Sequence, residues 1–382
     1  MSDFSFQIPQ KVLLSSYGII RLGEFVQEWG DKFMIVMDPI LTQVEAGEKI
    51  TKPLTDRKLD FFTFTDIEGP ADTKTLDSAL KLARQAHVDG IVAAGGSKAI
   101  SLGRAVAKLY NDTRETYTAL EKDDITAPPL PLVCVPTTIR DRFMFTQVIP
   151  LVDSRSSALR LMHTRSGAGD TIISDPNLTL SLSNNQSSSI TLETLALAIE
   201  AYISPRANFF SDMATEKSLE LLSLAYHGTG SIDVTTPKEE LLAQGGLMAS
   251  LAAATSSLGM TSLLAVCINA RYGTPSGLVA SVLLPYIVDD AAKFRLGRLA
   301  NAARLLKATE GGTDDAKAAS DLADFIRKEL AASNLPARMK DLNLTLENLS
   351  LAAEDAGKTE FINSLPRSMS SDDLFALIKT AY

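Results

Sequence analysis

An acidic residue, Glu193, interrupts a segment whose other residues predict an apolar helix. Residues 190–204 read ITLETLALAIEAYIS, and their apolar positions recur at helical spacing over about four turns. Glu193 has leucines close by on both sides, so we expect it to meet the protein interior, whereas Glu200 can be solvated. A buried carboxylate is unfavourable unless it is protonated, paired or bound to a cation. Glu193 is therefore a candidate functional residue.

A glycine turn is the second candidate. Residues 89–110, DGIVAAGGSKAISLGRAVAKLY, read as a strand, a turn and a helix, an order that can place phosphate oxygens against backbone N–H groups at a helix N-terminus. Gly95 and Gly96 would permit the close approach that a side chain blocks. A purely structural strand-to-helix turn has the same pattern, so both interpretations stay open.

Asp38 is the third candidate, because it ends the apolar run FMIVMD at residues 33–38. An acid at the end of a strand can accept hydrogen bonds from an adenosine ribose and repel a 2′-phosphate, which favours NAD over NADP. A solvated loop acid is the alternative.

The elements that must position these residues alternate apolar runs with helical segments through residue 180. Such alternation is typical of a parallel sheet with helices on its faces. The predicted strands are 33–38, 61–64, 90–96, 130–138 and 171–175, and the helices between them include 73–87 and 100–112.

The pattern changes after residues 175–182, DPNLTLSL. Ala and Leu dominate from there to Tyr382, and helical periodicity replaces the β-branched runs. We therefore predict an α/β protein in which a Rossmann-like parallel-sheet domain, residues 1–180, is followed by an all-helical domain, residues 181–382.

Composition limits the partners. The formal net charge is -9, which disfavours binding to nucleic acid or to an anionic membrane, so small molecules or protein are expected instead. The start MSDFSFQIPQK has no signal pattern, and the longest nearly uncharged stretch, GMTSLLAVCINA at 259–270, is too short and polar to span a bilayer. These features predict a cytoplasmic protein. Cys134 and Cys267 lie in apolar runs and are predicted to be reduced, buried thiols.

Segments along nearly the whole chain resemble the iron-containing (group III) alcohol dehydrogenase family, whose relatives include glycerol dehydrogenase and dehydroquinate synthase. The resemblance implies a dehydroquinate synthase-like fold, NAD(P)-dependent alcohol dehydrogenase ancestry and a homodimer. The segments that carry it are FQIPQKVLLSSYGIIRLGEFV (6–26), PLVCVPTT (131–138), ISDPNLTLSL (173–182), LALAIEAYIS (195–204), YGTPSGLVASVLLPYI (272–287) and SLPRSMSSDDLFALIKTAY (364–382).

The metal positions depart from the family. There, an Asp, a His four residues later and two further His hold a divalent metal, which polarises the substrate oxygen so that hydride can leave for the nicotinamide. The matching positions here are Glu193, Leu197, Ser262 and Ser276, and another family His falls on Val266. One carboxylate and two hydroxyls suit Fe or Zn poorly. The resemblance thus implies no Fe or Zn, with Mg on Glu193 and water as the alternative. Without a metal, Glu193 should be protonated or paired, with Ser262 and Ser276 as candidate partners.

The first cofactor turn is also altered. Where the family has Gly-Gly-Gly-Ser, this chain has Gly95, Gly96, Ser97 and Lys98. The family's Asp, which follows after two further residues, is replaced here by Ser101. Arg104 follows where the family has Lys. Loss of the Asp resembles the maleylacetate reductase branch, which is thought to work without metal.

The second cofactor turn changes more. The family's Thr-Thr-Ala-Gly-Thr-Gly-Ser-Glu becomes TTIRDRFM at residues 137–144, so only Thr137 and Thr138 remain as candidate cofactor contacts. Long and aromatic side chains there would fill space that NAD needs. Alternatively, Lys98, Arg140 and Arg142 form a new anion site. A salt-bridged surface loop is the third interpretation.

Two functional hypotheses follow. In the first, the protein is a pseudoenzyme that binds a nucleotide, another small molecule or a protein partner and has lost metal-dependent dehydrogenase chemistry. In the second, it is a metal-independent NAD(P)-dependent oxidoreductase for a small alcohol or carbonyl compound, with Arg140 or Arg142 as the catalytic candidates that replace the metal's charge.

Overall fold

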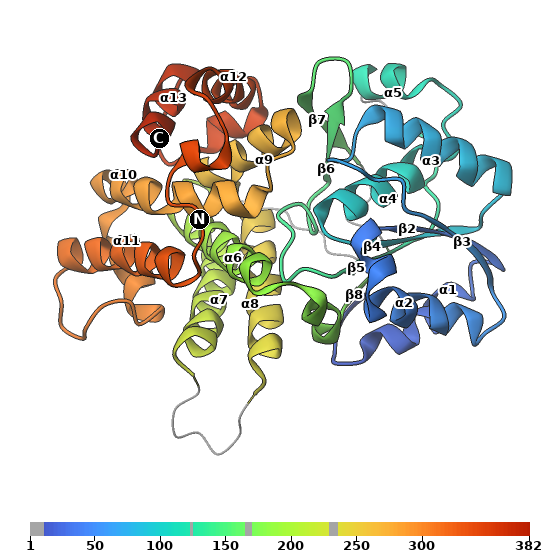
Figure 1. The fold of residues 1–382 in the computed structure, drawn as a ribbon, viewed down its shortest axis with the longest axis horizontal. Helices are drawn as coiled ribbons and strands as arrows, with labels where there is room; N and C mark the ends of the chain where they lie inside the picture. The colour runs from blue at the N-terminus through green and yellow to red at the C-terminus, as the bar shows by residue number, and fades with distance from the viewer. Residues whose placement is uncertain (1–10, 123–124, 165–169, 229–235) are drawn as a thin grey trace. The chain divides into compact units, whose positions relative to one another are not determined.

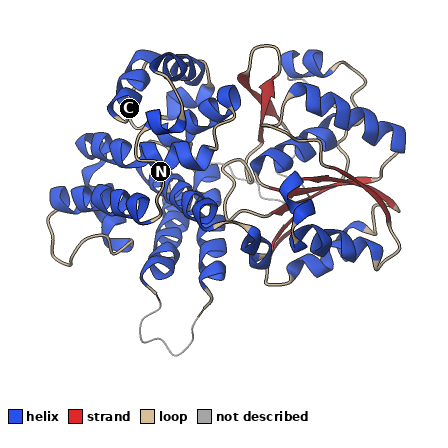
Figure 2. Ribbon diagram, in the orientation of Figure 1, coloured by secondary structure: helices blue, strands red, loops and turns tan. Residues whose placement is uncertain are grey.

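The computed structural model describes residues 11–122, 125–164, 170–228 and 236–382, so residues 6–10 of the opening segment lie outside it. The chain divides into two compact units, Gln7–Ser181 and Leu182–Tyr382. In the described ranges, all strands belong to the first unit, and the second is helical (Figure 2). This confirms the predicted fold class.

A parallel six-stranded sheet in the order β1-β8-β5-β4-β2-β3 forms the centre of the first unit. The register pairs Met37 with Ala94 and Gly95 with Pro136, so the carboxyl ends of β2, β4 and β5 meet at one edge, where α/β proteins bind ligands. The strands are β1 Lys11–Leu14, β2 Lys32–Met37, β3 Asp60–Phe64, β4 Gly90–Gly95, β5 Leu132–Pro136 and β8 Thr171–Ser174.

Helices cover both faces of this sheet, with α3 and α4 on one face and α1 and α2 on the other (Figure 1). The central strands are therefore buried on both sides, which explains their continuous apolar runs. The helices of this unit are α1 Leu22–Val26, α2 Glu45–Thr55, α3 Thr73–Ala86, α4 Ser97–Leu109 and α5 Thr116–Lys122, with the short 3-10 helices η1 Gly18–Arg21, η2 Pro39–Gln43 and η3 Pro176–Ser181.

An antiparallel hairpin, β6 Val148–Asp153 and β7 Ala158–His163, lies outside the predicted strands. Contacts from distant parts of the chain hold it. Val152 forms a bridge with Asp72, and the Ser154 N–H donates to Thr73 Oγ1 at 3.1 Å. These contacts join the hairpin to the start of α3.

The second unit packs its helices around α6, which is buried on nearly every side, as a core helix with little amphipathic character should be. Among the described residues, no single helix is long and apolar enough to cross a membrane; α8 and α9 meet those criteria only together, with a 96° bend between them. The helices are α6 Asn184–Ile203, α7 Phe209–His227, α8 Lys238–Thr255, α9 Met260–Tyr272, α10 Ser276–Leu305, α11 Asp315–Ala332, α12 Leu346–Gly357 and α13 Ser371–Thr380, with η4 Met339–Leu342 and η5 Glu360–Ser364.

Candidate functional site

The glycine turn follows β4 and opens α4. Gly95 has φ +142°, and a Cβ there would lie 2.6 Å from Asp38 Cβ, so only glycine fits. Gly96 is the residue before α4 and gives that helix no side-chain cap. The requirement for Gly95 therefore comes from Asp38 on the neighbouring strand end, independently of any ligand.

Asp38 already has partners within the chain. Its Oδ1 accepts from the Ile40 N–H at 3.4 Å and lies 3.4 Å from Lys98 Nζ. Lys98 also donates to the Ile67 carbonyl at 3.4 Å. The acid predicted to bind a ribose is thus paired with the lysine of the adjacent cofactor turn, and a ribose would have to compete with that lysine.

The second cofactor turn lies against the first, because the Thr137 N–H donates to the Gly95 carbonyl at 3.0 Å. Arg140 folds back on its own loop, where its Nη1 lies 3.4 Å from Thr138 Oγ1. Arg140 and Arg142 are both buried, so the interpretation of a salt-bridged surface loop is wrong for these two arginines. Lys98, in contrast, is part-exposed and ion-paired with Asp38. Ser101, one turn into α4, is buried as well.

Arg104 anchors the end of this loop. Its guanidinium donates to three carbonyl oxygens, those of Phe143 at 3.0 Å, Thr146 at 2.8 Å and Val148 at 3.2 Å. The side chain is only 3% exposed, and burial lowers the pKa of Arg104. In the sequence, Arg104 stands out only as an arginine where the family has lysine. An arginine amid the apolar residues of a predicted helix was the signal for a buried structural role.

Asp141 is a second residue that sequence reasoning did not single out. It is buried, and its Oδ1 accepts from the Phe143 N–H at 2.8 Å. The hydroxyl of Ser97, the first residue of α4, also bonds its carboxyl group. Burial raises the pKa of Asp141, while the nearby Arg104 and Arg142 act in the opposite direction.

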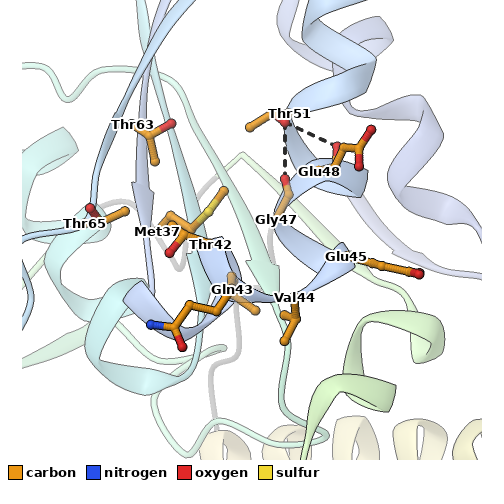
Figure 3. A pocket seen from close by; sticks show the side chains of 11 residues that line it. Met37, Thr42, Gln43, Val44, Glu45, Gly47, Glu48, Thr51, Thr63 and Thr65 are labelled. Carbon is orange, nitrogen blue, oxygen red and sulfur yellow. Dashed lines mark hydrogen bonds between the residues drawn. The ribbon is translucent and has the colours of Figure 1, made fainter.

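A hollow of about 580 Å³ opens beside the ends of β2 and β3. Figure 3 shows Thr63 and Thr65 on one side of it and Gly47, Glu48 and Thr51 of α2 on the other. Its volume lies within the usual range for small-molecule sites, and its position at the carboxyl ends of the strands is typical of α/β proteins.

In the helical unit, Glu193 lies on α6 and is 1% exposed. Ser276, at the start of α10, donates its hydroxyl to Glu193 Oε1 at 2.9 Å, which confirms this predicted pairing. The next residue, Gly277, packs so closely that a Cβ there would lie 3.3 Å from Glu193 Oε2. Leu197, which lies one helical turn after Glu193 on α6, is also buried.

Glu200 occupies the N-terminus of α9. Its carboxyl group accepts from the backbone N–H groups of Thr261 and Ser262, the latter at 3.1 Å. It is 2% exposed, so the expectation of a solvated Glu200 is wrong. Burial raises the pKa of Glu200. Gly259 permits the contact, because a Cβ there would lie 2.5 Å from Glu200 Cδ.

The four family metal positions do not form a set of ligands suited to Fe or Zn. Glu193 is bonded by Ser276, Leu197 has no donor atom in its side chain, and Ser262 is a partner of Glu200. Imidazole and thiolate, which these metals prefer, are missing from all four. Across the described ranges, no three His, Cys, Asp or Glu side chains gather as a metal site.

Comparisons with known proteins identify the same family over most of the chain. The family profile "Iron-containing alcohol dehydrogenase" matches residues 9–176, and "Fe-containing alcohol dehydrogenase family, C-terminal" matches residues 189–382. The 1,3-propanediol dehydrogenase of Citrobacter freundii is 23% identical over 383 residues, with 99% of each chain covered. A probable alcohol dehydrogenase, EutG, of Escherichia coli strain K12 is 23% identical over 378 residues, covering 99% of this chain and 94% of the relative.

Solved structures show the same fold. A 1,3-propanediol oxidoreductase superposes with a TM-score of 0.91 at 22% identity and full coverage of both chains. Sulfoacetaldehyde reductase from Bifidobacterium kashiwanohense in complex with NAD+ superposes with a TM-score of 0.81 at 18% identity, covering 100% of this chain and 99% of that one.

Proposed function

Because the chain belongs to the iron-containing alcohol dehydrogenase family, we propose that it is a divergent member that has lost metal-dependent hydride transfer and acts by binding a nucleotide, another small molecule or a protein partner. The hydrogen bond from Ser276 to Glu193 carries this proposal. In the metal-dependent reaction of the family, the metal polarises the substrate oxygen. At the corresponding positions this chain has a carboxyl group bonded to a hydroxyl, a leucine and a second serine.

The first unit, which contains the parallel sheet, supports a function in binding without turnover. Asp38 and the hollow beside β2 and β3 offer an acid and room for an adenosine group. Lys98 competes for the acid, and the loop 137–144 brings buried arginine, phenylalanine and methionine side chains to the region that follows β5. We therefore expect weak binding of adenine nucleotides, with a Kd of about a millimolar.

A second candidate function is a metal-independent NAD(P)-dependent oxidoreductase for a small alcohol or carbonyl compound. The observation that favours it is the burial of Arg140 and Arg142 directly after Thr137 and Thr138. A buried guanidinium stabilises negative charge on a substrate oxygen far better than an exposed one. In this function, one of the two arginines would supply the charge that the metal supplies in the family.

Calorimetric titration with NAD, NADH, NADP and NADPH, followed by NADH oxidation assays with small aldehydes and ketones, separates the two functions. We expect weak or undetectable dinucleotide binding and no turnover. Addition of Fe or Zn to the assay is the control, and it should not produce activity. NADH oxidation in the common enzyme range of roughly 1 to 1000 per second contradicts the loss of activity and makes Arg140 and Arg142 the first residues to substitute.

A further inference from the structure

Asp141 is an acid buried within the loop that covers the glycine turn. Its side chain is 4% exposed, although burial of an isolated carboxylate is strongly unfavourable. Several groups compensate: the Phe143 N–H at 2.8 Å, the Ser97 hydroxyl, and the charges of Arg104 and Arg142. The carboxyl group is thus held in a polar site built from α4 and from its own loop.

This site lies at the N-terminus of α4. Ser97 is the first residue of that helix, and Gly96 before it offers no side-chain cap. The first turn of α4 also contains no acidic residue. A helix N-terminus carries partial positive charge and attracts anions. Asp141, from the loop that follows β5, places its carboxyl group there through its hydrogen bond with the Ser97 side chain.

We propose that Asp141 is a built-in substitute for a phosphate group at the N-terminus of α4, and that it makes the glycine turn reject ligands that place a phosphate or pyrophosphate there. The proposal rests on the proposed function, because it specifies which part of a dinucleotide this chain disfavours. It leaves the hollow beside β2 and β3 accessible to an uncharged base and ribose.

The physical reason is competition between like charges. A pyrophosphate at the start of α4 would have to displace the Asp141 carboxylate from Ser97 or bind beside it, and two adjacent anions repel. Removing the charge of Asp141 leaves the α4 N-terminus, Arg104 and Arg142 with an excess of positive charge. That set of groups suits a phosphate.

The test compares binding of inorganic pyrophosphate and of ADP, by calorimetry, to the wild type and to Asp141→Asn. Asparagine keeps the shape and removes the charge, so affinity for pyrophosphate should rise by about tenfold or more. Asp141→Thr, shorter and neutral, is a second variant in case asparagine disturbs folding, which thermal unfolding will show.

A matched control isolates the carboxylate. Asp60→Asn makes the same change of net charge at an exposed position at the opposite end of β3, and should leave affinity unchanged.

The proposal is overturned if the wild type binds pyrophosphate as tightly as the folded Asp141 variants, or if Asp60→Asn gains as much affinity as they do. NADH oxidation by the wild type would instead contradict the proposed function. The two failures are therefore distinguishable, since pyrophosphate binding requires no turnover.

Discussion

At the scale of single residues, Glu193 and Ser276 form a contact that joins α6 to α10. A hydrogen bond from a hydroxyl to a buried carboxyl group satisfies one oxygen without requiring a cation nearby. The contact therefore stabilises Glu193 in the core, although leucine and serine occupy the positions where the family has metal-binding histidines.

Glu193→Gln should change the free energy of unfolding by no more than about 1 kcal/mol, because an amide oxygen accepts the same hydrogen bond. Urea unfolding followed by circular dichroism measures the difference. Ser276→Ala is the control, and it should destabilise by about 1 kcal/mol. A loss of several kcal/mol in Glu193→Gln would show that Glu193 is ionised and strongly paired.

Glu200 makes stability depend on pH. Burial raises its pKa above the ordinary value of 4.5, so the folded protein retains this proton to higher pH than the unfolded chain does. The contribution to stability is fully present below the unfolded pKa and is lost as pH rises through the folded pKa. Glu200→Gln has no such proton to lose.

The free energy of unfolding of the wild type, minus that of Glu200→Gln, should therefore fall as pH rises from about 4.5 toward neutrality. Denaturant unfolding of both proteins at a series of pH values gives this difference directly. A difference that stays constant, or that grows with pH, would mean that the α9 N–H groups hold the pKa of Glu200 at or below its ordinary value.

At the scale of elements, the turn between β4 and α4 contains two glycines in different situations. Gly95 has a positive φ and touches Asp38, whereas Gly96 has φ -79° and its nearest neighbour would lie 3.7 Å from an added Cβ. Only the first is required by the packing of the turn.

Gly95→Ala should therefore lower the free energy of unfolding by more than about 2 kcal/mol, through backbone strain and the clash with Asp38. Gly96→Ala should stay within about 1 kcal/mol of the wild type and serves as the matched control. Thermal and urea unfolding of the two variants measure the contrast. Equal stability of the two would refute the structural role assigned to Gly95.

At the scale of the whole molecule, each unit departs from the family's sequence pattern at a different site. The helical unit has no histidine at the family's metal positions, and the first unit has a charged, bulky loop where the family has small residues. Under the proposed function, restoring the family's chemistry requires substitutions at Leu197, Ser262 and Ser276 in the helical unit as well as in the loop 137–144 of the first unit.

We expect purified protein to contain much less than one Fe, Zn or Mn ion per chain, and chelator to leave its melting temperature unchanged. Elemental analysis and thermal unfolding with and without chelator make the measurement. Leu197→His alone should not restore metal binding, because the other two positions still hold serine. A content near one ion per chain in the wild type would refute the proposed loss of the metal site.

The sequence by itself determined the fold class, five of the six parallel strands and the family, because these depend on local periodicity and on short motifs. The runs around Ile35, Val92 and Val133 are buried strands, and the Ala- and Leu-rich second half is helical, as predicted. Aligned motifs also brought Glu193 and Ser276 together correctly.

Only the tertiary structure decided how the buried polar groups are paired. Glu200 accepts from the N-terminus of α9, about 60 residues further along the chain, and no residue near Glu200 in the sequence indicates this contact. Arg104 likewise donates to carbonyl oxygens of residues 143–148, which lie far from it in the sequence. The β6–β7 hairpin likewise depends on contacts with Asp72 and Thr73. Hydrophobic periodicity reports which face of an element is buried, but the partner of a buried charge is set by whichever distant segment the fold places against it.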